Sequence, residues 1–198
     1  MIYLTEGVFP DGYFGKCLSG LRTDMAVVND LISRLLPSLT EHMTGLSLEN
    51  ELLTQFDPPL VDMYTLQWFV TLFTNCLPRK LVLRVWDLLL IEGDEILIRT
   101  ALAIWELLGE KIRFIDSAED FCSILSVLVK ELRELDDEQS DHLVDNMLSM
   151  TAFPFPRLSE LRAENRLDTA DHNSGSRKRS LVSAHETRRT SYISMVAD

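Results

Sequence analysis

The 198-residue sequence is poor in the residues that make tight turns, with 8 glycines and 7 prolines. A β-sandwich or barrel needs a turn signal about every ten residues, and this supply is too small for one. No segment alternates apolar and polar residues over enough positions to indicate a strand. These two absences argue against an all-β fold.

Cysteine is also scarce. Cys17, Cys76 and Cys122 are widely spaced, odd in number and form no C-x-x-C motif, whereas a disulfide framework uses an even set. The first residues, MIYLTEGVF, lack the basic leader and long apolar stretch of a secretory signal. We therefore expect reduced, mostly buried thiols and a cytoplasmic protein.

Signatures of catalysis and of cofactor binding are missing from the sequence. It contains neither G-x-G-x-x-G nor G-x-x-x-x-G-K-[ST], the glycine-rich loops that hold phosphates. The histidines, His42, His142, His172 and His185, have no partners at metal-ligand spacing. Serine, histidine and aspartate occur without a nucleophile-elbow sequence. We expect no cofactor, no metal site and no active site of the chain's own.

Basic charge is in short supply, and the net charge is −12. Residues 171–198 carry five basic and three acidic side chains, which leaves a net charge of −14 on residues 1–170. A nucleic-acid platform needs a basic face to neutralise phosphates, and anionic lipid attracts basic segments. The acidic body therefore argues against nucleic acid as a partner and against direct adsorption on a membrane.

One long apolar run is present, QWFVTLFTNCLPRKLVLRVWDLLLIEGDEI at residues 67–96. A membrane-spanning helix needs about 20 largely uncharged residues, but Pro78 divides this run and charged residues interrupt it. Among these are Arg79, Lys80, Arg84, Asp87 and Glu92. The run is therefore predicted to form two buried helices that meet at Leu77 and Pro78, with no insertion into a membrane.

Apolar residues at helical spacing and helix-terminating residues predict an all-α, multi-helix bundle. The segment SLENELLTQF at 47–56 fits a short helix or an inserted loop equally well. Asp24 and Asp57 are predicted N-caps, and Ser117 opens a variant of the capping box. The predicted helices cover residues 24–36, 37–45, 57–77, 78–93, 94–115, 117–132 and 138–150.

Large aromatic side chains in these helices identify the expected core, since burying one stabilises a fold by about 1.5–3 kcal/mol. Arg99 lies among apolar residues and is predicted to form an ion pair with Glu92 or Asp94. The predicted core aromatics are Trp68, Phe69, Phe73, Trp86 and Trp105.

The end of the chain differs in character. Residues 153–167 read as a proline-containing linker with a short helix, and residues 168–198 as a disordered, basic, Ser/Thr-rich tail. Arginines lie three residues before Ser180 and Ser191, the spacing that a basophilic kinase reads. These serines are candidate phosphorylation sites; a solvated linker with accidental matches explains the same pattern equally well.

Several motifs in a fixed order resemble one family. LQWFVTLFTNCLP, VLRVWDLLLIEG and ILIRTALAIWELLGE look like the second half of a TBC domain, and VNDLISRLLPSLTEHM fits the preceding part. The resemblance runs from Tyr3 to Met150. MTAFPFPRLSELR is similar to the segment that follows the domain in one member. The resemblance implies that residues 1–152 are the C-terminal portion of such a helical domain.

This resemblance implies a function. TBC domains stimulate GTP hydrolysis by Rab-family small GTPases, which regulate vesicle traffic, and a Rab partner could recruit the protein to a membrane. The family supplies an arginine from an I-x-x-D-x-x-R motif and a glutamine from a Y-x-Q motif, and such arginines raise rates by about 10³–10⁵. Neither motif occurs here, and in the family both precede the matched region. We expect a Rab regulator with no catalytic residues of its own, inactive when alone.

Two alternatives stay open at this stage. The chain fits a catalytically silent GTPase-binding or scaffold module on the same fold. A helical-repeat adaptor of the HEAT or TPR kind is a third reading, although no repeat period is visible. The sequence leaves open whether it represents a fragment, an alternative start or an incomplete gene product.

Overall fold

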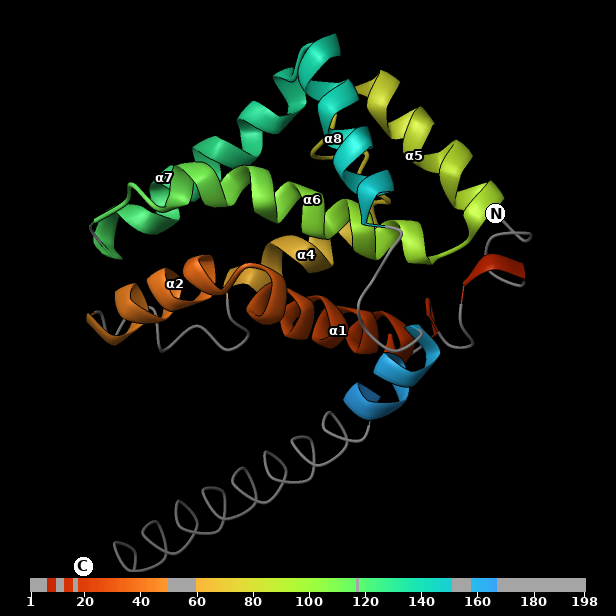
Figure 1. The fold of residues 1–198 in the computed structure, drawn as a ribbon, viewed down its shortest axis with the longest axis horizontal. Helices are drawn as coiled ribbons and strands as arrows, with labels where there is room; N and C mark the ends of the chain where they lie inside the picture. The colour runs from red at the N-terminus through yellow and green to blue at the C-terminus, as the bar shows by residue number, and fades with distance from the viewer. Residues whose placement is uncertain are drawn as a thin grey trace, which may run out of the picture.

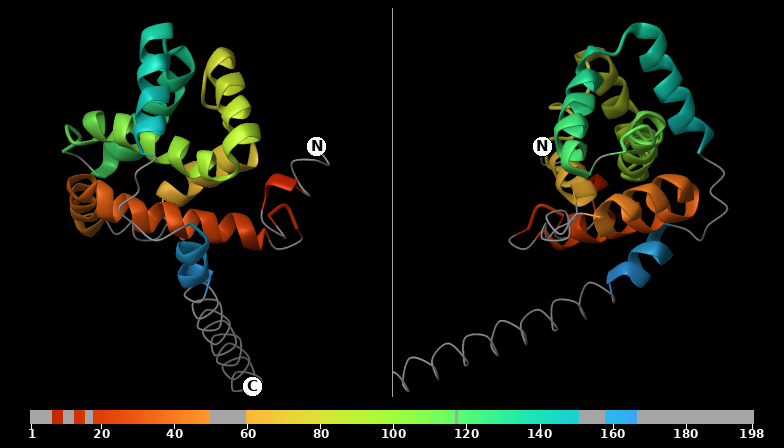
Figure 2. Two further views of the ribbon diagram at one scale, coloured as in Figure 1. Left: turned by 45° about the vertical axis from the view of Figure 1, so that its right-hand side comes forward. Right: turned by 90° about the vertical axis from the view of Figure 1, so that its left-hand side faces the viewer.

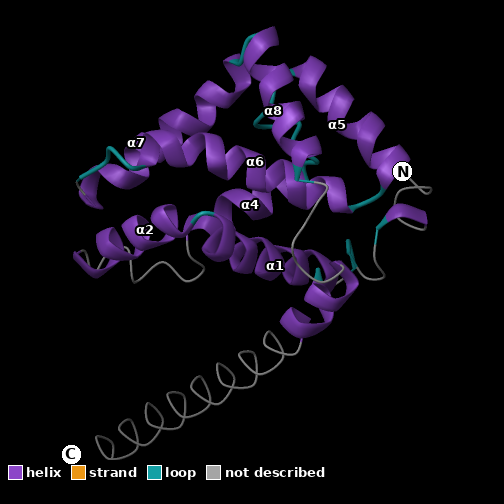
Figure 3. Ribbon diagram, in the orientation of Figure 1, coloured by secondary structure: helices purple, strands orange, loops and turns teal. Residues whose placement is uncertain are grey.

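The computed structural model describes residues 7–9, 13–15, 18–49, 60–116, 118–150 and 158–166. This part of the chain consists of helices joined by short turns and contains no strand (Figure 3). The predicted all-α fold is confirmed. The elements are α1 (Ser19–Leu35), α2 (Pro37–Glu49), α4 (Leu60–Val70), α5 (Arg79–Glu92), α6 (Glu95–Ile112), α7 (Ala118–Glu131), the short 3₁₀ helix η2 (Leu132–Glu134), α8 (Asp137–Ser149) and a helix at 158–166.

Some predictions fall outside the described residues. These are the caps at Asp57 and Ser117, most of the segment at 47–56, the phosphorylation sites Ser180 and Ser191, and all of the tail at 168–198. Helix α2 continues through Glu49, four residues past its predicted end at Gly45.

Helix α6 is the centre of the fold. It packs on α1 on one side and on α5, α7 and α8 on the other, and α4 lies between it and α1 (Figures 1 and 2). Every residue from Ile96 to Trp105 is buried. A helix that is apolar on nearly all sides is stable only when it is covered on nearly all sides, which accounts for this position.

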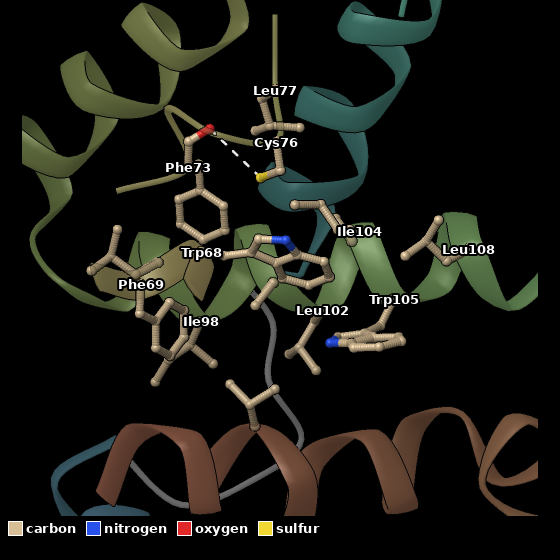
Figure 4. Packing of buried hydrophobic residues seen from close by; sticks show 14 of the residues in the cluster. Trp68, Phe69, Phe73, Cys76, Leu77, Ile98, Leu102, Ile104, Trp105 and Leu108 are labelled. Atoms are coloured by element: carbon tan, nitrogen blue, oxygen red, sulfur yellow. Dashed lines mark hydrogen bonds between the residues drawn. The ribbon is translucent and has the colours of Figure 1, made fainter. Parts of the chain in front are cut away.

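Four of the five predicted core aromatics gather around α6 (Figure 4). The rings of Trp68 and Trp105 lie 5.2 Å apart between centroids, and Phe69 meets Phe73 edge-on at 6.0 Å. Trp105 Nε1 donates a hydrogen bond of 3.1 Å to Thr65 Oγ1. The core therefore joins α4, the turn after it and α6 through aromatic contacts.

Trp86 differs from the prediction, because it is only half-buried. Its Nε1 donates to the carbonyl of Leu72 at 3.0 Å, so the polar end of the indole points inward. Helix α5 buries one face on α6, with Leu81, Val85 and Leu89 completely covered, and Trp86 stands at the border of that face. The apolar run placed Trp86 in a helix correctly but could not tell which side of the helix would be covered.

The helix predicted to run from 57 to 77 ends early, at Val70. The amide of Phe73 donates to the carbonyl of Trp68 at 2.8 Å and the amide of Leu72 to that of Phe69 at 3.2 Å, which is the Schellman arrangement. Leu72 has a φ of 48° and Phe73 a φ of 63°, in the left-handed region that normally favours glycine. Without a glycine to mark it, this helix end is invisible in the sequence.

Helix α1 begins at Ser19, five residues before the predicted cap. Asp24 lies within the helix and is completely buried, so the prediction that it caps the helix is wrong. Gly20 allows α1 to approach the segment before it, because a Cβ there would stand 3.0 Å from the Tyr13 Cα.

The ends of α5, α6 and α8 agree with the helix-starting and helix-terminating residues in the sequence. Gly93 has a φ of 93° and ends α5 where the sequence predicted it. A capping box formed by Asp136 and Gln139 opens α8.

Lys80 and Arg84 on α5 form ion pairs with Asp137 and Asp141 on α8, respectively. These pairs are exposed and contribute little stability.

Candidate partner-binding surface

No group in the described part of the chain has the geometry of a catalytic or metal centre. No cluster of three or more His, Cys, Asp or Glu side chains in that part could hold a metal ion. Burial raises the pKa of the Cys76 thiol to about 12, so this cysteine stays protonated and is a poor nucleophile. Cys76 packs in the core, with its thiol directed at the carbonyl of Phe73 (Figure 4).

Arg99 is a structural cation. It is nearly buried and pairs with Glu95 at 2.6 Å and with Glu92 at 3.4 Å. The predicted pairing with Glu92 is confirmed, whereas the alternative partner, Asp94, binds a different arginine. Arg99 is thus held by two carboxylates of its own neighbourhood.

That other arginine forms the most enclosed charge cluster among the described residues. Arg162, in the helix at 158–166, donates to both carboxylate oxygens of Asp24, at 2.6 and 2.8 Å, and to Asp94 at 2.6 Å. The Asp24 side chain is 1% exposed and that of Arg162 14%. We call these three residues the Arg162 clamp. It joins α1, the turn before α6 and the helix at 158–166, which lies beneath α1 in Figure 1.

Burial dominates the electrostatics of the clamp. Desolvation raises the pKa of the Asp24 carboxyl, and the hydrogen bonds from Arg162 act in the opposite direction. Tyr13 is buried nearby, and its pKa is raised well above the usual value by burial and then by Asp24. The cluster fixes three segments together; since its charges are satisfied internally, it is not a binding site.

A cavity of about 700 Å³ lies at the surface between the start of α5 and the end of α7. Its apolar wall is formed by the turn before α5 and by one side of α5. The residues of this wall are Leu77, Pro78, Val82, Leu83 and Trp86. Leu83 is 50% exposed, so the wall is accessible from solvent.

Thr74 and four charged side chains line the rest of this cavity. The charged residues are Arg79 from α5, Lys130 from α7, and Arg133 and Glu134 from η2. The three cations form no ion pair with any other described residue. The cavity therefore combines an apolar wall with an excess of positive charge, on a chain whose net charge is −12. We call it the α5–η2 pocket.

Further apolar side chains are exposed outside the pocket. Ile91 at the end of α5 is 79% exposed, Phe114 after α6 is 84% exposed, and Val127 on α7 is 51% exposed. Single exposed apolar residues are common on soluble proteins. The pocket differs because apolar and cationic groups converge on one concave surface.

Sequence reasoning did not find this pocket. The signal in the sequence is weak: Arg79 follows the Pro78 break, and Lys130 and Arg133 fall on the polar side of an amphipathic helix, where solvated charges are ordinary. Only the packing of α7 and η2 near α5 brings the three cations together.

Among the described helices, none has the combination of length and apolarity needed to cross a membrane.

Known proteins are similar to this chain in sequence and in fold. The profile described as the Rab-GTPase-TBC domain matches residues 1–113. TBC1 domain family member 30 from Homo sapiens is 44% identical over 164 residues, which is 82% of this chain and 18% of that protein. TBC1 domain family member 2A from Rattus norvegicus is 29% identical over 84% of this chain and 16% of its own length. The chain thus spans less than one fifth of the length of these relatives.

A solved structure agrees with the sequence comparisons. The crystal structure of the Chlamydomonas flagellar RabGAP TBC domain matches with a TM-score of 0.54 and 25% identity, over 74% of this chain and 42% of that chain. The resemblance drawn from the order of motifs is confirmed. This chain belongs to the Rab-GTPase-TBC domain family.

Proposed function

We propose that this chain is the C-terminal portion of a Rab GTPase-activating domain and that it binds a Rab-family GTPase through its helical surface. The match of residues 1–113 to the Rab-GTPase-TBC domain is the observation that carries this proposal. The 44% identity to TBC1 domain family member 30 extends the support over most of the chain. We place the end of the domain at residue 152, with the linker and helix at 153–167 and the tail after it.

The proposed contribution of this portion is binding and not chemistry. The 198 residues contain neither I-x-x-D-x-x-R nor Y-x-Q, the motifs that the family uses to stabilise the transferred phosphoryl group and to orient the attacking water. Arg99 and Arg162 are the arginines held most firmly inside the described part, and carboxylates already engage both. A positioned arginine that is free to reach a nucleotide is what the chemistry requires, and neither residue meets that requirement.

A catalytically silent binding or scaffold role on the same fold is the second candidate. The buried helical core supports a folded surface that can bind a partner even without the finger residues. In both cases the partner is a Rab, and recruitment to a membrane would follow from the membrane attachment of that GTPase.

Binding to a panel of purified Rab GTPases tests the proposal. Each Rab is loaded with a non-hydrolysable GTP analogue or with GDP and titrated against the 198-residue chain by biolayer interferometry. We expect at least one Rab to bind, with affinity about tenfold higher in the GTP-analogue state, because regulators of hydrolysis recognise the GTP-bound conformation. Circular dichroism verifies that the chain is helical. A helical chain that binds no Rab in either state would contradict the proposal.

A further inference from the structure

The α5–η2 pocket carries an inference about a second partner. Its wall is apolar and concave, as in sites that receive a bulky side chain, and its volume of about 700 Å³ lies within the range of about 300–1,000 Å³ typical of ligand pockets. The Nε1 atom of Trp86 is already bonded to the carbonyl of Leu72. The remaining ring surface of Trp86 can therefore contact an apolar group without leaving a buried polar atom unpaired.

The net positive charge of the pocket limits the chemical class of molecule that can occupy it. Arg79, Lys130 and Arg133 outnumber Glu134, whereas the whole chain carries an excess of acidic residues. Some other cations at the surface of the described part pair with carboxylates across helices, as Lys80 does with Asp137 and Lys111 with Glu131. The three pocket cations have no such partner among the described residues. They favour carboxylates supplied from outside, and complementary charge of this kind raises association rates and specificity.

We propose that the α5–η2 pocket docks an acidic segment of a partner protein, with one bulky apolar side chain seated against Val82, Leu83 and Trp86. Carboxylates on either side of that anchor pair with Arg79, Lys130 and Arg133. This combination of a central apolar anchor and a charged rim is the usual anatomy of a protein interface. The proposal goes beyond GTPase binding, and its test contains no GTPase, so either can fail alone.

A displayed library of random short peptides, selected against the folded 198-residue chain, provides the probe. We expect the enriched peptides to combine several Asp or Glu residues with a Trp, Phe or Leu. Their affinity, measured by fluorescence anisotropy on synthesised copies, should fall at least tenfold when the central apolar residue becomes Ala or when the acidic residues become Gln. It should also fall as salt concentration rises, because ions screen exposed charge pairs.

Two pairs of matched variants locate the binding on the molecule. The double variant Arg79→Glu with Arg133→Glu should weaken peptide binding at least tenfold, while the double variant Arg22→Glu with Arg113→Glu, at exposed arginines outside the pocket, should leave the affinity within about twofold. Leu83→Asp should abolish binding, while Ile91→Asp on the same helix should not, because Ile91 lies outside the pocket. Thermal unfolding of each variant verifies that it is folded.

Several results would overturn the proposal. One is a selection that enriches no peptide, or that enriches only peptides without acidic residues. Binding that survives both the double charge reversal and Leu83→Asp would place the peptide elsewhere. Self-association of the chain that the same variants abolish, seen by sedimentation in the absence of peptide, would make the occupant a second copy.

Discussion

Helices α5 and α6 are consecutive and both are rich in leucine and isoleucine, but they expose that apolar surface very differently. In α6 every residue from Ile96 to Trp105 is buried. In α5 the covered side is limited, and Leu83, Leu90 and Ile91 are 50%, 51% and 79% exposed. The cause is position: α6 is enclosed by α1, α4, α5, α7 and α8, whereas α5 packs mainly on α6.

The difference between the two helices shows that apolar composition alone does not determine burial. Apolar residues on the inner side of α5 stabilise the fold, whereas Leu83 and the partly buried Trp86 line the α5–η2 pocket, and Leu90 and Ile91 lie outside it. Helix α6 therefore determines stability, and we assign the side of α5 that carries Leu83 to recognition. Substitutions on each side separate the two roles.

The largest effect is expected in the core. Trp105→Ala should lower the free energy of unfolding by about 3–5 kcal/mol, because it leaves a cavity and removes the partner of Thr65. The matched change Trp86→Ala should cost less, about 1–2 kcal/mol, since that side chain is only partly buried, although its hydrogen bond to Leu72 is lost. Urea denaturation of both variants measures the difference. Equal costs would show that α5 is as enclosed as α6.

A somewhat smaller effect, which depends on pH, is expected at the Arg162 clamp. Arg162→Met should lower the free energy of unfolding by about 3 kcal/mol at pH 7, since the buried Asp24 carboxylate loses its counter-charge. Without Arg162 the pKa of Asp24 rises further above its ordinary value of about 4. The folded state then holds a proton that the unfolded state has released, so the stability of the variant falls as pH rises through this window.

The difference in the free energy of unfolding between wild type and Arg162→Met should therefore increase from pH 4 towards pH 7. Chemical denaturation at several pH values measures this difference. Glu164→Met, at an exposed position of the same helix, is the control and should stay within about 0.5 kcal/mol of wild type. If the difference in the free energy of unfolding stays constant or decreases as pH rises, Asp24 is not buried against Arg162.

The sequence was sufficient for the fold class and for most of the core. Helical periodicity predicted α5, α6 and α8 closely, because each has clear terminal signals such as Pro78, Gly93 and the acidic residues before α8. The aromatics Trp68 and Trp105 could be assigned to the core from spacing, since Trp68 lies in a helix that is apolar on nearly every side and Trp105 falls among the inward-facing positions of α6.

The predictions that were wrong concern positions whose structure depends on contacts with distant segments of the chain. Asp24 has the residue type of a cap, but it pairs with an arginine 138 positions later in the chain. The end of α4 depends on Leu72 and Phe73 adopting left-handed backbone angles, which tertiary packing imposes against their intrinsic preference. The pocket cations come from α5, α7 and η2, and no local pattern records that these elements meet.

Single-turnover GTP hydrolysis by a Rab that binds the chain tests the account's central claim most directly. With the chain in saturating excess over the GTP-loaded Rab, we expect the hydrolysis rate to stay within about twofold of the intrinsic rate, since both finger motifs are absent. An arginine finger raises such rates by about 10³–10⁵, so its presence would be unmistakable. A large acceleration that is lost when an arginine of this chain is replaced by alanine would contradict the account.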